Sequence, residues 1–157
     1  MADVRILGAG VAGLSIAAAL SARGIDAVVT DPAGPPGPHG CSWWAGGMLA
    51  PYCERESAEE PVLRHGRNAA DWWAKHTEVT RNGSLVLALG RDQADLTRFA
   101  RRTTGFEEVN DQQISTLEPD LAGRFRKALF FAEEAHLSPR AALAALAAKT
   151  NFNDDTA

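Results

Sequence analysis

The sequence has few of the residues that build disulfide frameworks or metal centres. Among 157 residues there are only two cysteines, Cys41 and Cys53, too few for a set of disulfides and without the C-x-x-C spacing of zinc and redox sites. The four histidines show no spacing that suits a metal ion on one element. We therefore expect no metal site, and the two cysteines fit a reducing cytoplasm.

The chain also lacks an excess of positive charge and a hydrophobic run that would clearly span a membrane. Its net charge of −4 gives no reason to expect nucleic acid as a partner. The longest apolar run, residues 6–22, contains three glycines, follows Asp3 and is short for a bilayer span. A secretory signal is the alternative, because the run ends in Ala-Leu-Ser-Ala, but the glycine spacing and Asp3 favour a cytoplasmic domain.

What the sequence does have is a β-α-β pattern at its start. Apolar residues 4–7 predict a strand, residues 11–23 a helix of small residues, and residues 27–30 a second, β-branched strand. Residues 32–40 hold four prolines and three glycines, which excludes regular structure. This segment alone would suit an interdomain linker. The sequence that follows, CSWWAGGMLAP at residues 41–51, instead indicates backbone that packs closely against a neighbouring group.

The helices and strands after residue 57 are predicted from helix-capping residues and from the periodicity of apolar residues. A capping box at Ser57–Glu60 with Pro61 predicts a helix to about Thr77, with Trp72 and Trp73 in a core. Strands are predicted at 84–89 and 128–132, and helices at 93–103, at 111–117 and after Ser138. The polar tail, residues 151–157, has no strand pattern and is predicted to be disordered. The predicted segments are a Rossmann unit at 1–57, the start of a substrate region at 58–132, a return helix at 133–150 and the tail.

The strongest motif is Gly8-Ala9-Gly10-Val11-Ala12-Gly13, which is G-x-G-x-x-G between a predicted strand and helix. Gly8 permits the tight turn, Gly10 lets a pyrophosphate approach the backbone, and Gly13 lets the helix lie close to the strand. The free N–H groups near Val11 and Ala12 would face the phosphates. A glycine-rich helix start that binds nothing is the alternative, and the strand–helix context argues against it.

Asp31 extends this motif. It ends the second predicted strand, 18 residues after Gly13, where a carboxylate takes the adenosine ribose hydroxyls and would repel a 2′-phosphate. NADP is therefore disfavoured. FAD and NAD present the same ADP half to such a turn, so these residues leave both cofactors open.

With Asp31, the Pro/Gly loop and residues 41–51 in view, the chain resembles the D-amino-acid-oxidase-type flavoproteins. Within that family it is most similar to the glycine oxidases of thiamine biosynthesis. The resemblance includes Cys53-Glu54-Arg55-Glu56-Ser57, Leu117-Glu118-Pro119 and residues 134–139. It implies an α/β fold, in which a flavin-type Rossmann β-α-β unit is followed by the start of an α+β substrate domain.

The resemblance also implies a set of residues that contact FAD. Val11 and Ala12 would lie on its pyrophosphate, and Asp31 with Pro32 would meet the ribose. Gly40, Cys41 and Ser42 would line the phosphate and ribityl path. Gly46, Gly47 and Met48 would pass their backbone against the isoalloxazine, which needs neighbours without bulky side chains. Tryptophans at 43 and 44 stand where small residues are usual in this loop.

The reaction that the resemblance implies is oxidation of glycine or a related small amine by hydride transfer to the flavin, with dioxygen as the second substrate. An oligomer is compatible with it. The arginines that hold the substrate carboxylate in the family belong to the C-terminal half, so no catalytic residue is assigned here. A third parallel strand is not evident after Lys149, and we expect a truncated chain that is not a competent oxidase alone. The alternative is an NAD-binding regulatory Rossmann module without catalysis.

Overall fold

A computed structural model describes residues 2–153 of the chain. Its contacts divide the chain into two units. Among the described residues, unit 1 comprises residues 2–47, 73–78 and 137–153, and unit 2 comprises residues 48–72 and 79–136. The chain leaves unit 1 after Gly47, passes through it again at residues 73–78 and returns to it at Leu137. The first and last of these boundaries lie ten residues before and four residues after those expected from the sequence.

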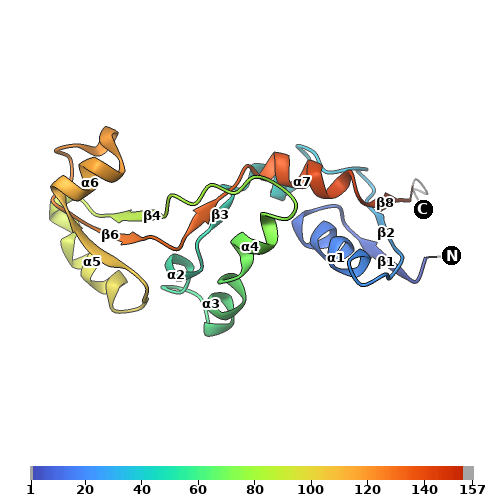
Figure 1. Ribbon diagram of the computed structural model, residues 1–157, viewed down its shortest axis with the longest axis horizontal. Coiled ribbons are helices and arrows are strands. Elements are labelled where there is room, and N and C mark those ends of the chain that lie inside the picture. Colours follow the sequence, from blue (N-terminus) through green and yellow to red (C-terminus); the bar gives the residue numbers. More distant parts are fainter. Residues whose placement is uncertain (1, 154–157) are drawn as a thin grey trace. The chain divides into compact units, whose positions relative to one another are not determined.

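Unit 1 contains a parallel sheet in the order β1-β2-β8 (Figure 1). Its strands are β1 (Val4–Leu7), β2 (Ala27–Thr30) and β8 (Asn151–Phe152). The helices are α1 (Val11–Ser21), the 3-10 turn η1 (Cys41–Trp44) and α7 (Pro139–Ala147). Ile6, Ala17 and Val29 form the centre of the core between α1 and the sheet. The β-α-β unit predicted from residues 4–30 is present.

The strand β8 corrects two expectations. The tail was predicted to lack a strand, and the third parallel strand was thought to be missing, yet Asn151 and Phe152 pair in parallel with Val28 and Val29. Asn153 extends the pairing by donating its N–H to the carbonyl of Val29 at 2.9 Å. A two-residue strand carries no periodicity of its own, and its position is set by α7, which returns the chain to the sheet. Residues 154–157 of the predicted tail lie outside the described residues.

Unit 2 is built on an antiparallel sheet in the order β4-β6-β5. It contains β4 (Ser84–Leu87), β5 (Glu107–Asn110) and β6 (Lys127–Phe131), with α5 (Gln93–Ala100) and α6 (Asp111–Leu117) on opposite faces (Figure 1). Leu129 and Phe131 face Leu96 of α5, whereas Ala128 packs with Ile114 of α6. Short turns η2 (Gly90–Asp92) and η3 (Pro119–Leu121) flank these helices.

The remaining elements of unit 2 follow the glycine pair. A two-stranded sheet joins β3 (Met48–Leu49) to β7 (Ala135–His136), and α2 (Pro51–Glu54) and α3 (Glu60–Gly66) come directly after β3. The short helix α4 (Ala69–Trp73) ends at the boundary with unit 1. No helix in the described residues combines the length and the apolar character that a membrane span requires.

The long helix predicted from Ser57 to Thr77 was wrong. Glu59 is the N-cap of α3 without a side-chain cap bond, while the N–H of Ser57 bonds the carbonyl of Glu54 in the turn that ends α2. Gly66 is the last residue of α3 and lies against Pro51: a Cβ at this position would come 2.7 Å from the Pro51 Cβ. A turn at residues 67–68 separates α3 from α4, so the segment whose pattern was helical forms two short helices.

Smaller differences have local causes. The strand β5 was missed because the sequence Glu-Glu-Val-Asn offers one buried residue, Val109, and no apolar alternation. Strand β4 ends at Leu87 instead of 89, and α5 ends at Ala100 instead of 103, where the Thr103 hydroxyl instead donates to the carbonyl of Tyr52. The predicted burial also differs: Trp72 and Trp73 are half-buried, and Val62 is 42% exposed.

Candidate cofactor-binding site

The glycine turn between β1 and α1 is shaped by backbone contacts that leave no room for side chains. Gly8 has φ +103°, which favours glycine, and its N–H donates to the carbonyl of Thr30 at 2.9 Å. A Cβ on Gly13 would lie 2.0 Å from the Gly8 carbonyl oxygen and 3.3 Å from Cγ2 of Ile6. Gly13 therefore fixes the distance between α1 and β1, as predicted from the motif.

The start of α1 is open on the side that a phosphate would approach. Val11 and Ala12 are exposed, and Gly10 is an N-cap without a side-chain cap bond. The Val11 N–H donates to Oγ of Ser42, in the loop that follows β2, at 3.1 Å. A Cβ on Gly10 would lie 3.2 Å from that same oxygen. Ser42 is thus brought beside the helix start from 31 residues away.

Asp31 joins the end of β2 to the glycine turn. Its Oδ2 accepts the Ala9 N–H at 2.8 Å, and its Oδ1 accepts the Ala33 N–H at 2.9 Å. These two backbone bonds, the Ala9 bond first, lower the pKa of the Asp31 carboxyl below its ordinary value of 3.8. Because each carboxylate oxygen has a second lone pair, Asp31 can hold the turn and still accept ribose hydroxyls.

We expect Asp31 to make stability depend on pH at the acid end. A folded-state pKa below the unfolded value stabilises the fold above about pH 4, and this contribution is lost as pH falls through the folded pKa. Urea midpoints at pH 7 and pH 3 should differ more for the wild type than for Asp31→Asn. Asp120→Asn, which alters an exposed carboxyl in unit 2, should behave like the wild type. Equal pH dependence in all three proteins would contradict this role for Asp31.

The Pro/Gly loop ends in η1, which is attached to the start of α7. The guanidinium of Arg140 lies over the rings of Trp43 and Trp44, at 5.4 and 5.1 Å from their centroids. Trp44 also donates its Nε1–H to the carbonyl of Pro38 at 2.9 Å, although 64% of its surface is exposed. Sequence reasoning missed Arg140, because a cation over an aromatic ring depends on a contact between distant segments.

The predicted site residues of unit 1 therefore gather in part. The glycine turn, Asp31 and Ser42 are connected by hydrogen bonds, whereas Pro32, Cys41 and Gly46 are exposed and Gly40 bonds within its own loop. Gly47 has φ +74°, and its carbonyl accepts the Leu137 N–H at 2.9 Å. Met48 belongs to unit 2, where it begins β3, pairs with His136 and is 59% exposed.

The helix that follows Met48 is anchored by a buried acid that the sequence did not single out. Glu134 is fully buried, and its Oε1 accepts the N–H of Cys53 in α2 at 2.8 Å. Tyr52, one residue earlier, donates its hydroxyl to Glu133 at 2.5 Å, which raises the Tyr52 pKa. The pair Glu133–Glu134 thus fixes α2 immediately after the predicted flavin loop. The sequence around these two adjacent acids gave no signal of this role.

The two cysteines should differ in reactivity. Burial, followed by hydrogen bonding to Glu134, raises the pKa of the Cys53 thiol, whereas Cys41 is exposed. Iodoacetamide at pH 8 should modify Cys41 at least about tenfold faster than Cys53, because the thiolate is the nucleophile. Mass spectrometry of time points would measure both rates, with the urea-unfolded chain as the control in which they converge. Equal rates in the folded protein would contradict the buried environment of Cys53.

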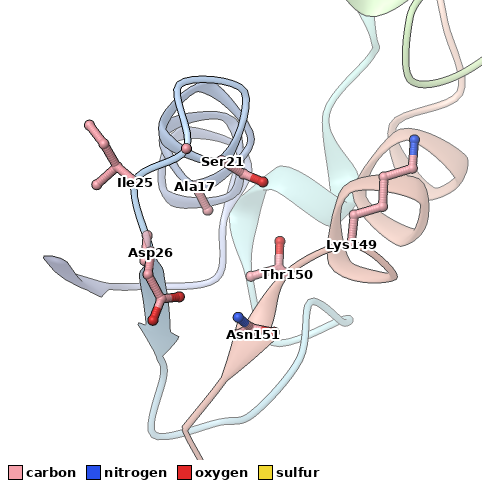
Figure 2. A pocket seen from close by; sticks show the side chains of 9 residues that line it. Ala17, Ser21, Ile25, Asp26, Lys149, Thr150 and Asn151 are labelled. Atoms are coloured by element: carbon pink, nitrogen blue, oxygen red, sulfur yellow. The ribbon is translucent and has the colours of Figure 1, made fainter. Parts of the chain in front are cut away.

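A cavity of about 220 Å³ lies at the other end of the unit 1 sheet. Figure 2 shows Ser21, Asp26, Thr150 and Asn151 around it, while the Lys149 ammonium points away. Ser21 ends α1, and Asp26, Thr150 and Asn151 lie at the amino ends of β2 and β8. Ligands of open parallel sheets bind outside the carboxyl ends of the strands, where Gly8 and Asp31 are. We therefore assign the cofactor to the glycine turn and not to this cavity.

The residues at the glycine turn fit an adenine dinucleotide. The helix start offers exposed amides without side chains above them, and Asp31 offers carboxylate lone pairs. Beside them, Oγ1 of Thr30 is buried without a hydrogen-bond partner among the described residues, the kind of group that a bound polar ligand or water satisfies. The fold and this site define a dinucleotide-binding unit of the Rossmann type, which by itself does not distinguish FAD from NAD.

Comparisons with known proteins make that distinction. The family model described as FAD dependent oxidoreductase matches residues 3–151, so the chain belongs to this D-amino-acid-oxidase-type family of flavoenzymes, whose cofactor is FAD. A Rhizobium etli protein, provisionally named the thiamine biosynthesis oxidoreductase ThiO, is 60% identical over 149 residues. That match covers 92% of this chain and 45% of the relative, so the chain spans about half the length of the relative.

Solved structures agree on the fold. Glycine oxidase from Geobacillus kaustophilus matches 96% of this chain and 46% of its own, with a TM-score of 0.75 and 23% identity. Iminodiacetate oxidase from Chelativorans sp. BNC1 matches 97% of this chain and 46% of its own, with a TM-score of 0.72 and 21% identity. Identities this low establish the fold of the matched half and carry no residue roles.

Proposed function

We propose that the protein to which this chain belongs oxidises glycine or a similar small amine or amino acid with FAD, as a step in thiamine biosynthesis, and that dioxygen is its second substrate. The observation that carries this proposal is the 60% identity to the thiamine-pathway relative over nearly the whole chain. The glycine oxidase fold of the matched half supports it. The free cysteines Cys41 and Cys53 are consistent with a cytoplasmic location, which is part of the proposal.

In this proposal the chain supplies the binding surface for the ADP half of the cofactor. The amides at Val11 and Ala12 hold the pyrophosphate, assisted by the positive end of the α1 dipole. Asp31 and Pro32 meet the ribose, and Gly40, Cys41 and Ser42 line the path toward the flavin. FAD, when bound, supplies the two-electron oxidation of the substrate C–H bond.

The protein's own contribution is to hold the cofactor in place and to keep bulky side chains away from its ring system. Gly46, Gly47 and Met48 are proposed to bring backbone against the flat ring system, since side chains there would keep it at a distance. Ser42 has a second task, because its hydroxyl accepts the Val11 N–H and so arranges the helix start before a phosphate arrives. A phosphate oxygen would take over that N–H, and Ser42 could then donate its own hydroxyl proton to the phosphate.

Retention of flavin tests the cofactor part of the proposal. The purified chain is incubated with FAD, desalted and examined by visible absorption, with NAD in a parallel sample. We expect flavin bands to be retained and alkylation of Cys41 to slow when FAD is present, while Cys53 is unaffected. Gly10→Val should lose the flavin, because its side chain would meet Ser42 Oγ. Retention of NAD without FAD would favour the regulatory module instead.

The substrate part needs the longer protein, because the chain spans about half of its relatives. We would join this chain to the remaining part of the Rhizobium etli relative, load the fusion with FAD and add glycine without oxygen. Bleaching of the flavin bands and peroxide formation on readmitting oxygen are the expected results. If the fusion retains flavin but neither small amino acids nor amines reduce it, the proposed substrate class is refuted and the family assignment is unaffected.

A further inference from the structure

The hydroxyl of Ser42 reaches the start of α1 from a segment with little structure of its own. Ser42 is the second residue of η1, a four-residue 3-10 turn in which no residue is buried. The turn follows the Pro/Gly loop, and a backbone hydrogen bond joins the N–H of Trp43 to the carbonyl of Gly40 at 3.1 Å. Short, exposed segments with few buried contacts open readily, so contacts with other elements are needed to keep the Ser42 hydroxyl beside Val11.

Helix α7 provides such a contact through Arg140, its second residue. The guanidinium lies over both indole rings of η1, 5.4 Å from the centroid of Trp43 and 5.1 Å from that of Trp44. Indole attracts a cation more strongly than the other aromatic rings, and at exposed sites each such contact changes an equilibrium constant by a factor of about two to five. Because Leu143 and Leu146 of α7 are buried, Arg140 connects the exposed turn to a helix that is held in the protein interior.

The segment around η1 has two more contacts. Trp44 donates its Nε1–H to the carbonyl of Pro38 at 2.9 Å, and its ring is exposed, so burial does not account for the position of this side chain. After the tryptophans, the Gly47 carbonyl accepts the N–H of Leu137 at 2.9 Å, and a Cβ on Gly47 would lie 3.0 Å from Cδ of Pro139. The loop is therefore held before and after the two tryptophans, and the guanidinium holds the tryptophans themselves.

We propose that Arg140 is a positioning residue for FAD. By holding the indoles of Trp43 and Trp44, its guanidinium keeps η1 in the conformation that places the Ser42 hydroxyl at the helix start before the cofactor binds. A site that is already arranged in the free protein binds more tightly, because the cofactor does not have to order it. Arg140 acts through Ser42, so the inference rests on the proposed contact of Ser42 with the FAD phosphates and not on the oxidation of glycine.

The alternative is that Arg140 binds a phosphate group directly. Guanidinium groups pair readily with phosphate oxygens, and in that case the charge would matter and the rings beneath it would not. In the positioning role the rings are half of the contact. The double substitution Trp43→Leu/Trp44→Leu, which keeps the charge, should therefore weaken FAD binding to a similar degree as Arg140→Met. An effect of Arg140→Met without an effect of the double substitution would favour the direct ion pair and overturn the proposal.

Amide hydrogen exchange tests the positioning role without any cofactor. Exchange is followed by NMR at Val11, whose N–H is bonded to Ser42. Gly8, whose N–H is bonded to Thr30, serves as the internal reference. In Arg140→Met we expect exchange at Val11 to be at least about fivefold faster and exchange at Gly8 to be unchanged. No change at Val11, or equal acceleration at both amides, would overturn the proposal, since the second result would mean that unit 1 is loosened as a whole.

Titration with FAD, followed by flavin fluorescence, measures the consequence for the cofactor. It is carried out on this chain and on the fusion, so weak binding by the chain alone does not decide the result. Arg140→Met should raise the dissociation constant at least about fivefold, and Arg140→Lys should raise it less, because an ammonium group is also attracted to an indole ring. Arg23→Met removes the same charge from an exposed residue just after α1 and should leave the dissociation constant unchanged.

A double-mutant cycle separates this inference from the proposed function. Ser42→Ala should weaken FAD binding, and adding Arg140→Met to it should cause no further loss, because Arg140 acts through Ser42. Additive losses, or an undiminished affinity in Arg140→Met when Ser42→Ala weakens binding, would overturn the positioning role. An undiminished affinity in Ser42→Ala would instead refute the proposed contact of Ser42 with FAD, and exchange at Val11 would still show whether Arg140 holds Ser42 at the helix start.

Discussion

Gly13→Ala should destabilise the chain by about 3 kcal/mol and abolish retention of FAD. The added Cβ would lie 2.0 Å from the Gly8 carbonyl oxygen, a backbone atom that cannot move without deforming the turn. Overpacking of this kind costs about 1–3 kcal/mol and sometimes more. Alanine is the better helix former by about 1 kcal/mol, so the clash must exceed that gain for the prediction to hold. Urea denaturation at pH 7 measures the balance.

The control for Gly13 is Gly90, where the same substitution meets nothing. A Cβ on Gly90 has no neighbour within 4 Å, and its φ is not positive. Gly90→Ala should therefore change the free energy of unfolding by less than about 1 kcal/mol, in the stabilising direction if at all. If Gly13→Ala is as stable as Gly90→Ala, the close approach of α1 to β1 is not what the structure indicates.

Gly47→Ala should be comparably damaging, for two reasons that act together. Gly47 has φ +74°, where a Cβ costs about 1–2 kcal/mol. That Cβ would also lie 2.1 Å from the Leu137 carbonyl oxygen and 3.0 Å from Cδ of Pro139, the first residue of α7. We expect a loss of about 3 kcal/mol or more, measured by urea denaturation, with loosened packing of α7.

The adjacent Gly46 makes the comparison informative about function. A Cβ on Gly46 meets no atom within 4 Å, and its φ is not positive, so Gly46→Ala should keep wild-type stability within about 1 kcal/mol. If the backbone here lies against the isoalloxazine, as proposed, Gly46→Ala should weaken FAD retention in the fusion while stability is unchanged. Unchanged flavin affinity in Gly46→Ala would argue that Gly46 serves only the loop.

The two glycines show how far the sequence could go. The pair Gly46-Gly47 signalled close approach of backbone to something, and the resemblance suggested the flavin. The structure shows that Gly47 is required by the chain itself, through Leu137 and Pro139, ninety residues away in sequence. A glycine in a sequence can indicate that there is no room for a side chain at that position, but it does not identify the neighbouring group. The same holds for Gly66, whose neighbour is Pro51.

Helices α6 and α7, which begin at a clear capping signal in the sequence, were predicted well. The start of α7 followed from Ser138 and Pro139, and in the structure the Ser138 Oγ accepts the Ala141 N–H at 3.5 Å. The helix α6 was predicted with the bounds it has, although its capping box, Asn110 with Gln113, was not noticed. Elements that depend on partners were missed or misplaced, as β5, β8 and the division of residues 57–77 show.

By itself the sequence determined the β-α-β unit, the glycine turn, the acid at the end of β2 and the flavoprotein family, because each rests on residues close together in the chain or on a motif with fixed spacing. Only the tertiary structure decided that Ser42 and Asp31 bond the glycine turn, that Glu134 anchors α2, that Arg140 holds the tryptophans and that Asn151 and Phe152 complete three strands. The physical reason is that these contacts join segments from 22 to about 120 residues apart, and no local propensity records which distant group a buried amide or carboxylate will meet.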